Sequence, residues 1–339
     1  MNDSGSADSY PALPPASFPF AHYGPLTFGQ ILDRIAQILS RNWRLFLSLG
    51  SVPAGASLLI YAIVFGVMYK AGAFPATQHS PIPTHVLWQI FPVMAVCSIL
   101  MMIVYVLFEA AAAQAALAAN RGVTISFREA YATAWQHLGR FLGLIVMRTL
   151  WVMLPMMAIW IVAAVAFGIA AALGRGSFHP GAIFLLMPVV VLGYLGSLVY
   201  GVWMMMRLLL AVPASIAENL TVMAALKRSA ALAHKAKGRM FLVLLVMYAI
   251  GYAIFLVVEA IALAVAGIAL IVGRGMHIHW PHPIAVAAAV IFGLCAVVAF
   301  FLWIAAFWSA YAITFTVFYD DQRVRIDGPA PLLSDATIV

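Results

Sequence analysis

The sequence predicts an all-α integral membrane protein with six transmembrane helices. Hydrophobic residues make up 65% of the 339-residue chain, charged residues only 9%, and the mean hydropathy is +1.04. A soluble domain carries roughly 25% charged residues, so this chain has too little polar surface to be stable in water. In addition, the apolar residues fall into six runs long enough to cross a bilayer core of about 30 Å, and one order of elements recurs three times.

The first repeat begins with an amphipathic helix over residues 27–44, where apolar side chains recur at helical spacing opposite polar and basic ones. Thr27 and Gln30 have the spacing of a capping box, in which the two side chains satisfy each other's free backbone N–H groups. Apolar spans follow at about 45–69 and 88–119. The Ala-rich end of the second span lets neighbouring helices approach closely.

The second repeat has the same order. Ser126 and Glu129 have capping-box spacing at the start of another amphipathic helix. The expected third and fourth spans run from about 139 to 173 and from about 182 to 216. Pro213 should bend or break the fourth span near its end, because proline lacks the backbone N–H that a helix needs.

The third repeat departs from the capping rule. Thr221 stands at the capping position of the third amphipathic helix, but the residue three positions later is Ala224 and not the acid or amide that a capping box requires. The fifth and sixth spans are expected at about 240–272 and 285–318. Each repeat therefore consists of a surface helix and a helix pair.

These repeats define the expected domain organisation. A transmembrane domain over 26–321 comprises units of about 26–120, 121–219 and 220–319, between a disordered cytoplasmic tail (1–25) and a second cytoplasmic tail (322–339). Each unit crosses the membrane twice, so all three begin on the same side and predict a pseudo-threefold bundle. Most Lys and Arg residues flank the spans on the side of the termini, which predicts a multi-pass protein of the cytoplasmic (inner) membrane with both termini cytoplasmic.

Five ionisable residues within apolar spans or close to their ends are candidates for intramembrane sites: Glu109, Arg148, Arg207, Glu218 and Glu259. Each costs roughly 2.5–3.5 kcal/mol in hydrocarbon and should pair or face the bundle interior. Helical rise places Glu109 and Arg148 at a shared depth, so we expect Glu109 to pair with Arg148 or Arg207. Such a pair either fixes helix packing or lines a transport cavity, and Glu259, without an obvious partner, is a candidate for binding a proton or cation.

The outer loops are rich in histidine. His277, His279 and His282 are candidate ligands of zinc or copper, metals that bind imidazole near neutral pH. Alternatively, this loop is an interfacial anchor, with Trp280 at the level of the headgroups. The sequence contains no P-loop, GxSxG, HExxH or Gly-rich dinucleotide motif, so we expect no catalytic residue and no cofactor.

The basic residues of the surface helices predict contact with the lipid bilayer, because each such residue near anionic phospholipid contributes on the order of 1 kcal/mol. Their short clusters at the ends of apolar runs argue against a nucleic-acid partner, while an unidentified membrane or cytoplasmic protein partner is an alternative. The residues expected to contact headgroups are Arg34, Arg41, Arg128, Arg140, Lys227, Arg228, Lys235 and Arg239.

Three stretches carry a resemblance to a known family: LTFGQILDRIAQILSRNWRLF, RLLLAVPASIAENLTVMAALKRSAALAHK and TVFYDDQRVRIDG. Over about 25–321 the chain resembles the bacterial polytopic family labelled glycerophosphoryl diester phosphodiesterase membrane domain. Some members of that family carry a fused catalytic phosphodiesterase domain, and no such domain is expected here. The resemblance implies a bacterial cytoplasmic-membrane protein of unassigned role, with no catalytic residues to carry over.

Three functions follow from these features. The first is a non-enzymatic, lipid-associated accessory or scaffold protein. The second is a small transporter or channel-like protein with a charged cavity around Glu109, Arg207 or Glu259. The third is a metalloenzyme with its site on the outer face.

Overall fold

The computed structural model describes residues 25–70, 84–173, 180–275 and 282–328. Within these ranges all regular structure is helical, which confirms the all-α prediction. The helices are α1 (Phe28–Arg41), α2 (Trp43–Lys70), α3 (Thr84–Asn120), α4 (Phe127–Gln136), α5 (Leu138–Leu173), α6 (Pro180–Leu208), α7 (Ala211–Ala217), α8 (Val222–Ala233), α9 (Lys237–Gly275) and α10 (His282–Asp327). The expected disordered tail over 1–25 lies almost wholly outside the described residues.

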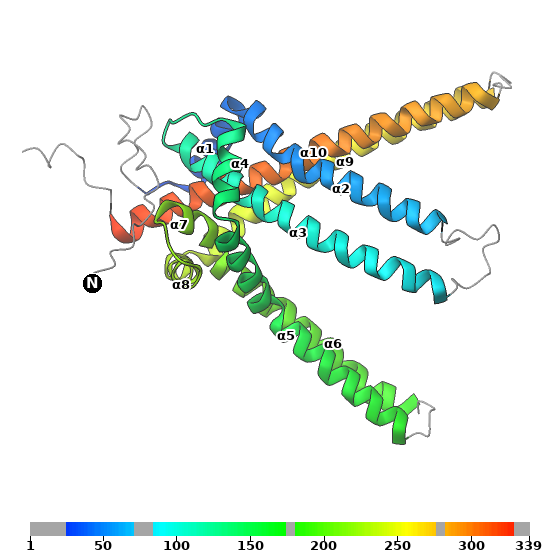
Figure 1. Ribbon diagram of the computed structural model, residues 1–339, viewed down its shortest axis with the longest axis horizontal. Coiled ribbons are helices and arrows are strands. Elements are labelled where there is room, and N and C mark those ends of the chain that lie inside the picture. Colours follow the sequence, from blue (N-terminus) through cyan, green and yellow to red (C-terminus); the bar gives the residue numbers. More distant parts are fainter. Residues whose placement is uncertain (1–24, 71–83, 174–179, 276–281, 329–339) are drawn as a thin grey trace, which may run out of the picture.

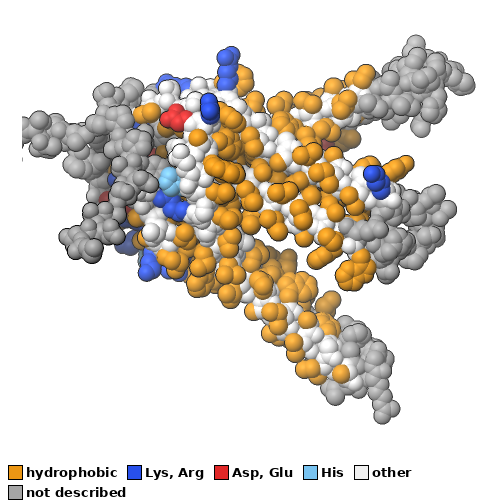
Figure 2. All heavy atoms as spheres, viewed as in Figure 1, with side chains coloured by type: hydrophobic (Ala, Val, Ile, Leu, Met, Phe, Trp, Pro, Cys, Tyr) orange, Lys and Arg blue, Asp and Glu red, His pale blue; other side chains and the backbone are white. Residues whose placement is uncertain are grey.

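Among the described residues, six helices are long and apolar enough to cross a membrane, so the chain is a multi-pass α-helical membrane protein. They form the pairs α2–α3, α5–α6 and α9–α10, which diverge from one end of the molecule (Figure 1). Only 6% to 17% of the most apolar window of each span is buried inside the protein. Hydrophobic side chains cover the visible surface of the pairs, which is the surface that lipid would contact (Figure 2).

The end from which the pairs diverge contains the short helices α1, α4, α7 and α8, and we call it the polar end. Most of the Lys and Arg side chains visible in Figure 2 gather there. A short helix precedes each pair of long helices, in the expected order, and α7 is an additional element. The predicted pseudo-threefold arrangement is not shown: α10 packs against α2 and α3, whereas α5 and α6 contact mainly each other and α8.

The helix starts follow the local capping rules. The capping boxes Thr27–Gln30 and Ser126–Glu129 are both formed, with each pair of side chains bonded to the other residue's backbone N–H. Thr221 is the N-cap of α8, but its side chain makes no capping hydrogen bond. The helix in which Ala224 stands in place of an acid or amide is therefore also the one whose N-cap side chain makes no hydrogen bond.

The helix of the fourth span is interrupted near Pro213, as the sequence predicts. Helix α6 ends at Leu208 and α7 begins at Ala211, with Pro213 inside it. A proline removes one backbone donor and its ring clashes with the carbonyl four residues earlier, which ends the longer helix. Ser229 of α8 repairs the break: its hydroxyl donates to the Arg207 carbonyl (2.9 Å) and accepts from the Leu210 N–H (3.1 Å).

Helix α1 packs its apolar face against protein rather than lipid. Ile31, Ile35 and Ile38 are at most 4% exposed and belong to the main hydrophobic core. The same core includes the Ala-rich end of α3, from Ala110 to Leu117, which confirms the expected close approach of helices there. The surface helix predicted over 27–44 therefore does not turn its apolar stripe to lipid, because the bundle already covers that stripe.

Helix α10 packs closely against α2. Near its middle it approaches α2 so closely that a Cβ atom on Gly50 would lie 2.3 Å from the Ala305 carbonyl oxygen, so only glycine fits. Ser309 adds a hydrogen bond to the Phe46 carbonyl at 2.7 Å. The helix continues to Asp327, beyond the boundary expected at 321, so the first part of the predicted C-terminal tail is helical.

Candidate functional site

Glu109 and Arg148 form the ion pair that helical rise predicts. Arg148 donates from both terminal nitrogens to the two carboxylate oxygens of Glu109, at 2.7 and 2.9 Å. The side chains are only 14% and 10% exposed, and such a two-bond arrangement fixes the relative position of α3 and α5. The pair satisfies both charges, which is how a membrane interior accommodates them.

The other three intramembrane candidates lie apart from this pair. Arg207 places its guanidinium over the ring of Trp203, 5.5 Å from the centroid, and does not reach Glu109. Glu218 sits at the polar end, where it binds Arg228. Glu259 is exposed along an apolar groove between α9 and α10, and within the described ranges it has no hydrogen bond or ion pair. The described residues thus show no single cavity lined by these charges.

The last turns of α10, from Tyr319 to Asp327, form the polar connections of the molecule, and we call them the α10 terminus. Asp321 is at its centre, with a side chain that is 0% exposed. Its carboxylate accepts hydrogen bonds from the Leu26 N–H (2.8 Å), Arg239, and Arg325 (3.1 Å). One carboxylate therefore connects the start of α1, the start of α9 and α10 itself.

Asp320 makes a second connection, toward α1 and α3. Asn120 donates its amide to Asp320 at 2.5 Å, and Arg34 donates to the side chain and backbone carbonyl of Asn120 at 2.8 and 2.9 Å. Arg34 thereby caps the C-terminus of α3, where backbone carbonyls lack partners. Burial lowers the pKa of the Arg34 guanidinium below its ordinary value, and the Asp320 carboxylate partly offsets this effect.

Tyr319 and Asp327 make the third connection, toward α7 and α8. The Tyr319 hydroxyl donates to Glu218 at 2.7 Å, and Arg228 bridges Glu218, at 3.0 Å, to Asp327. The hydrogen bond that Arg228 donates to Asp327 is the main cause of the raised pKa of Arg228. Burial opposes this effect, and the hydrogen bond to Glu218 adds to it. Four charged or polar side chains thus hold α8 against α10.

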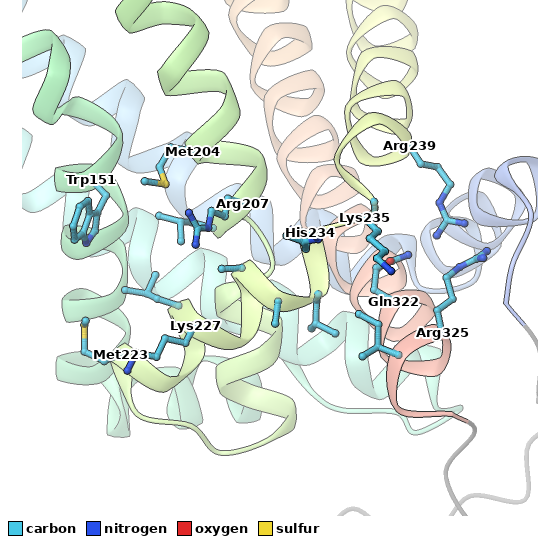
Figure 3. A pocket seen from close by; sticks show the side chains of 17 residues that line it. Trp151, Met204, Arg207, Met223, Lys227, His234, Lys235, Arg239, Gln322 and Arg325 are labelled. Carbon is cyan, nitrogen blue, oxygen red and sulfur yellow. The ribbon is translucent and has the colours of Figure 1, made fainter.

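A groove of about 1090 Å³ opens beside these connections, between α5, α6, α8, α9 and α10, and we call it the basic groove. Arg207, Lys227, Lys235, Arg239 and Arg325 line it, together with His234 and Gln322. Trp151, Met204 and Met223 supply an apolar wall at one side (Figure 3). Trp151 and Met204 lie on the spans α5 and α6, so the groove extends from the polar end toward the apolar part of the molecule.

The structure gives the eight expected headgroup residues two different roles. Arg34, Arg140, Arg228 and Arg239 are bonded within the protein; Arg140, for example, donates to Asn219 at 2.6 Å. Their charges hold helices together, and contact with lipid headgroups stays a prediction for all eight residues. Arg41, Arg128, Lys227 and Lys235 are exposed, and Lys227 and Lys235 line the basic groove.

The proposed metal ligands cannot be placed. His277 and His279 lie outside the described residues, and for His282 only the backbone, at the start of α10, is described. Among the described residues no group of three or more metal-ligating side chains occurs.

The residues of the α10 terminus were missed by sequence reasoning. Residues 322–327 fall in the predicted C-terminal tail, and Asp321 stands at the predicted end of the transmembrane domain, although it lies four residues before Arg325 on the same helical face. Adjacent acids after a long apolar run, in a basic chain, were the available signal. Ser229, which bonds the broken end of α6, gave no signal beyond its place on the apolar face.

No family model matches this chain, and no curated protein or solved structure is significantly similar to it. The resemblance to the membrane domain family therefore stays a prediction.

Replacing Glu109 by Gln should lower the free energy of unfolding by about 3 kcal/mol, because it leaves the buried Arg148 charge without its carboxylate. The double variant Glu109→Leu with Arg148→Met should regain most of this loss, since it removes both charges. Unfolding midpoints in detergent measure both effects, with Asp33→Asn, at an exposed position of α1, as a control that should leave stability unchanged. A Glu109→Gln protein as stable as the native one would contradict a structural role for the pair.

Replacing Asp321 by Asn should cost about 2–3 kcal/mol, because it removes the charge that Arg239 and Arg325 share at a fully buried position. The same substitution at Asp33, which is exposed on α1, should have no measurable effect. Equal unfolding midpoints for the two variants would show that Asp321 does not connect the helices as described.

Proposed function

We propose that this protein is a non-enzymatic, lipid-associated accessory or scaffold protein that binds anionic phospholipid in the basic groove. The proposal rests on the composition of the groove, where five cationic side chains converge beside an apolar wall that leads toward the membrane. An anionic headgroup would meet the cationic side chains, and its acyl chain would lie against Trp151 and Met204. A soluble anion has no acyl chain that could pack against the apolar wall.

The charge balance of the basic groove favours an anion. Among its five cationic side chains, Arg239 and Arg325 share the single carboxylate of Asp321. Arg207, Lys227 and Lys235 have no ion pair within the part of the chain that the structure describes. The groove therefore keeps a surplus of positive charge, which lipid phosphates can neutralise.

The orientation in the membrane is part of the proposal. Lys and Arg concentrate at the polar end, and the positive-inside rule then puts this end, and both termini, in the cytoplasm of a bacterial cell. The repeated order of short helix and long helix pair supports an origin from three tandem units. On this reading α4, whose Phe127 and Trp135 are exposed, lies closer to the membrane interface than α1 does.

Native mass spectrometry of the detergent-purified protein, titrated with phosphatidylglycerol, tests the proposal. Neutralising Arg207 and Lys235 together, each to Gln, should weaken binding by about 2 kcal/mol, or roughly thirtyfold, because each cation contributes on the order of 1 kcal/mol. Phosphatidylcholine should bind weakly to both proteins. The control Arg128→Gln removes an exposed cation of α4 outside the groove and should leave binding unchanged.

Equal phosphatidylglycerol affinity for the native protein and the double variant would contradict the proposal. Equal loss in the Arg128→Gln control would show that overall charge, rather than the groove, attracts the lipid.

A further inference from the structure

We infer that the basic groove holds a lipid with two phosphate groups joined through a glycerol bridge, the chemistry of a diphosphatidylglycerol. This inference rests on the proposed function and makes it more specific. Its basis is that the cations of the groove fall into two sets on either side of His234 (Figure 3). Arg207 and Lys227 form the first set, and Lys235, Arg239 and Arg325 form the second.

The first set comes from α6 and α8 and is free of carboxylates. Neither Arg207 nor Lys227 forms an ion pair among the described residues, and the Arg207 guanidinium stacks on Trp203 rather than on an acid. The break of α6 after Leu208 positions this set, because it lets α8 return beside the last turn of α6. Two uncompensated cations at the edge of the apolar part suit one phosphate diester.

The second set comes from the start of α9 and from α10. Arg239 and Arg325 hold one carboxylate between them, so this pair retains positive charge, and the exposed Lys235 adds to it. This set can neutralise a second phosphate.

The space between the two sets has a suitable size and chemistry. The groove has a volume of about 1090 Å³, enough for two phosphates and a short linker. His234 lies between the sets in Figure 3, the small side chains of Ala230 and Ala231 also line the groove, and no carboxylate is among the described residues that line it. A lipid with one phosphate would engage one set and leave the other uncompensated.

The experiment compares three lipids on the intact protein: diphosphatidylglycerol, phosphatidic acid and phosphatidylglycerol, titrated in native mass spectrometry. Phosphatidic acid concentrates its charge on one phosphate, so it separates the effect of charge from that of spacing. We expect diphosphatidylglycerol to bind roughly tenfold more tightly than either of the others. Neutralising the first set (Arg207→Gln with Lys227→Gln) should remove most of this preference. Lys235→Gln, which lowers the charge of the second set but leaves Arg239 and Arg325 in place, should reduce it, while Arg128→Gln should preserve it.

Equal affinity for all three lipids, or a preference that survives neutralisation of the first set, would overturn the inference. If phosphatidylglycerol binding still depends on the groove in that case, only the two-phosphate assignment fails. If no lipid depends on the groove, the proposed function fails as well. The comparison of lipids on the native protein remains decisive even if a variant unfolds, and unfolding midpoints identify such a variant.

Discussion

The arrangement of the polar end depends on the buried carboxylate of Asp321. A carboxylate with a side chain that is 0% exposed is stable only if its charge is compensated, and here two guanidinium groups and a backbone N–H do so. Because these donors belong to α9, α10 and Leu26, which lies two residues before α1, the need to compensate one charge fixes the first and last described parts of the chain against each other. Asp320, Tyr319 and Asp327 extend this constraint to α3 and α8.

The basic groove follows from the same constraint. The cations that Asp321 attracts exceed it in charge, and the break at Pro213 brings α8 and the end of α6 beside them. Only 6% to 17% of the most apolar window of each span is buried inside the protein, so lipid must cover the rest. The long helix pairs thus diverge from the polar end, and many of the charged side chains there either join helices or line the basic groove. The Glu109–Arg148 pair belongs to the first kind, which weakens the case for a charged transport cavity.

Features governed by local chemistry were predictable from the sequence. The six spans, both capping boxes and the break near Pro213 each depend on a few adjacent residues, and the pairing of Glu109 with Arg148 followed from helical rise alone. The role of α1 was not predictable, because an apolar stripe does not reveal whether protein or lipid covers it. The contacts of Asp321 were not predictable either: its bond to Leu26 spans 295 residues, and no local rule reports such a contact.

A density map of the protein in bilayer discs formed from its native membrane lipids would test the central claim most directly. The account places a lipid in the basic groove, with phosphate density beside Arg207 and beside Lys235 and with the α10 terminus helical to Asp327. An empty groove, or acidic side chains of the protein occupying it, would contradict the account.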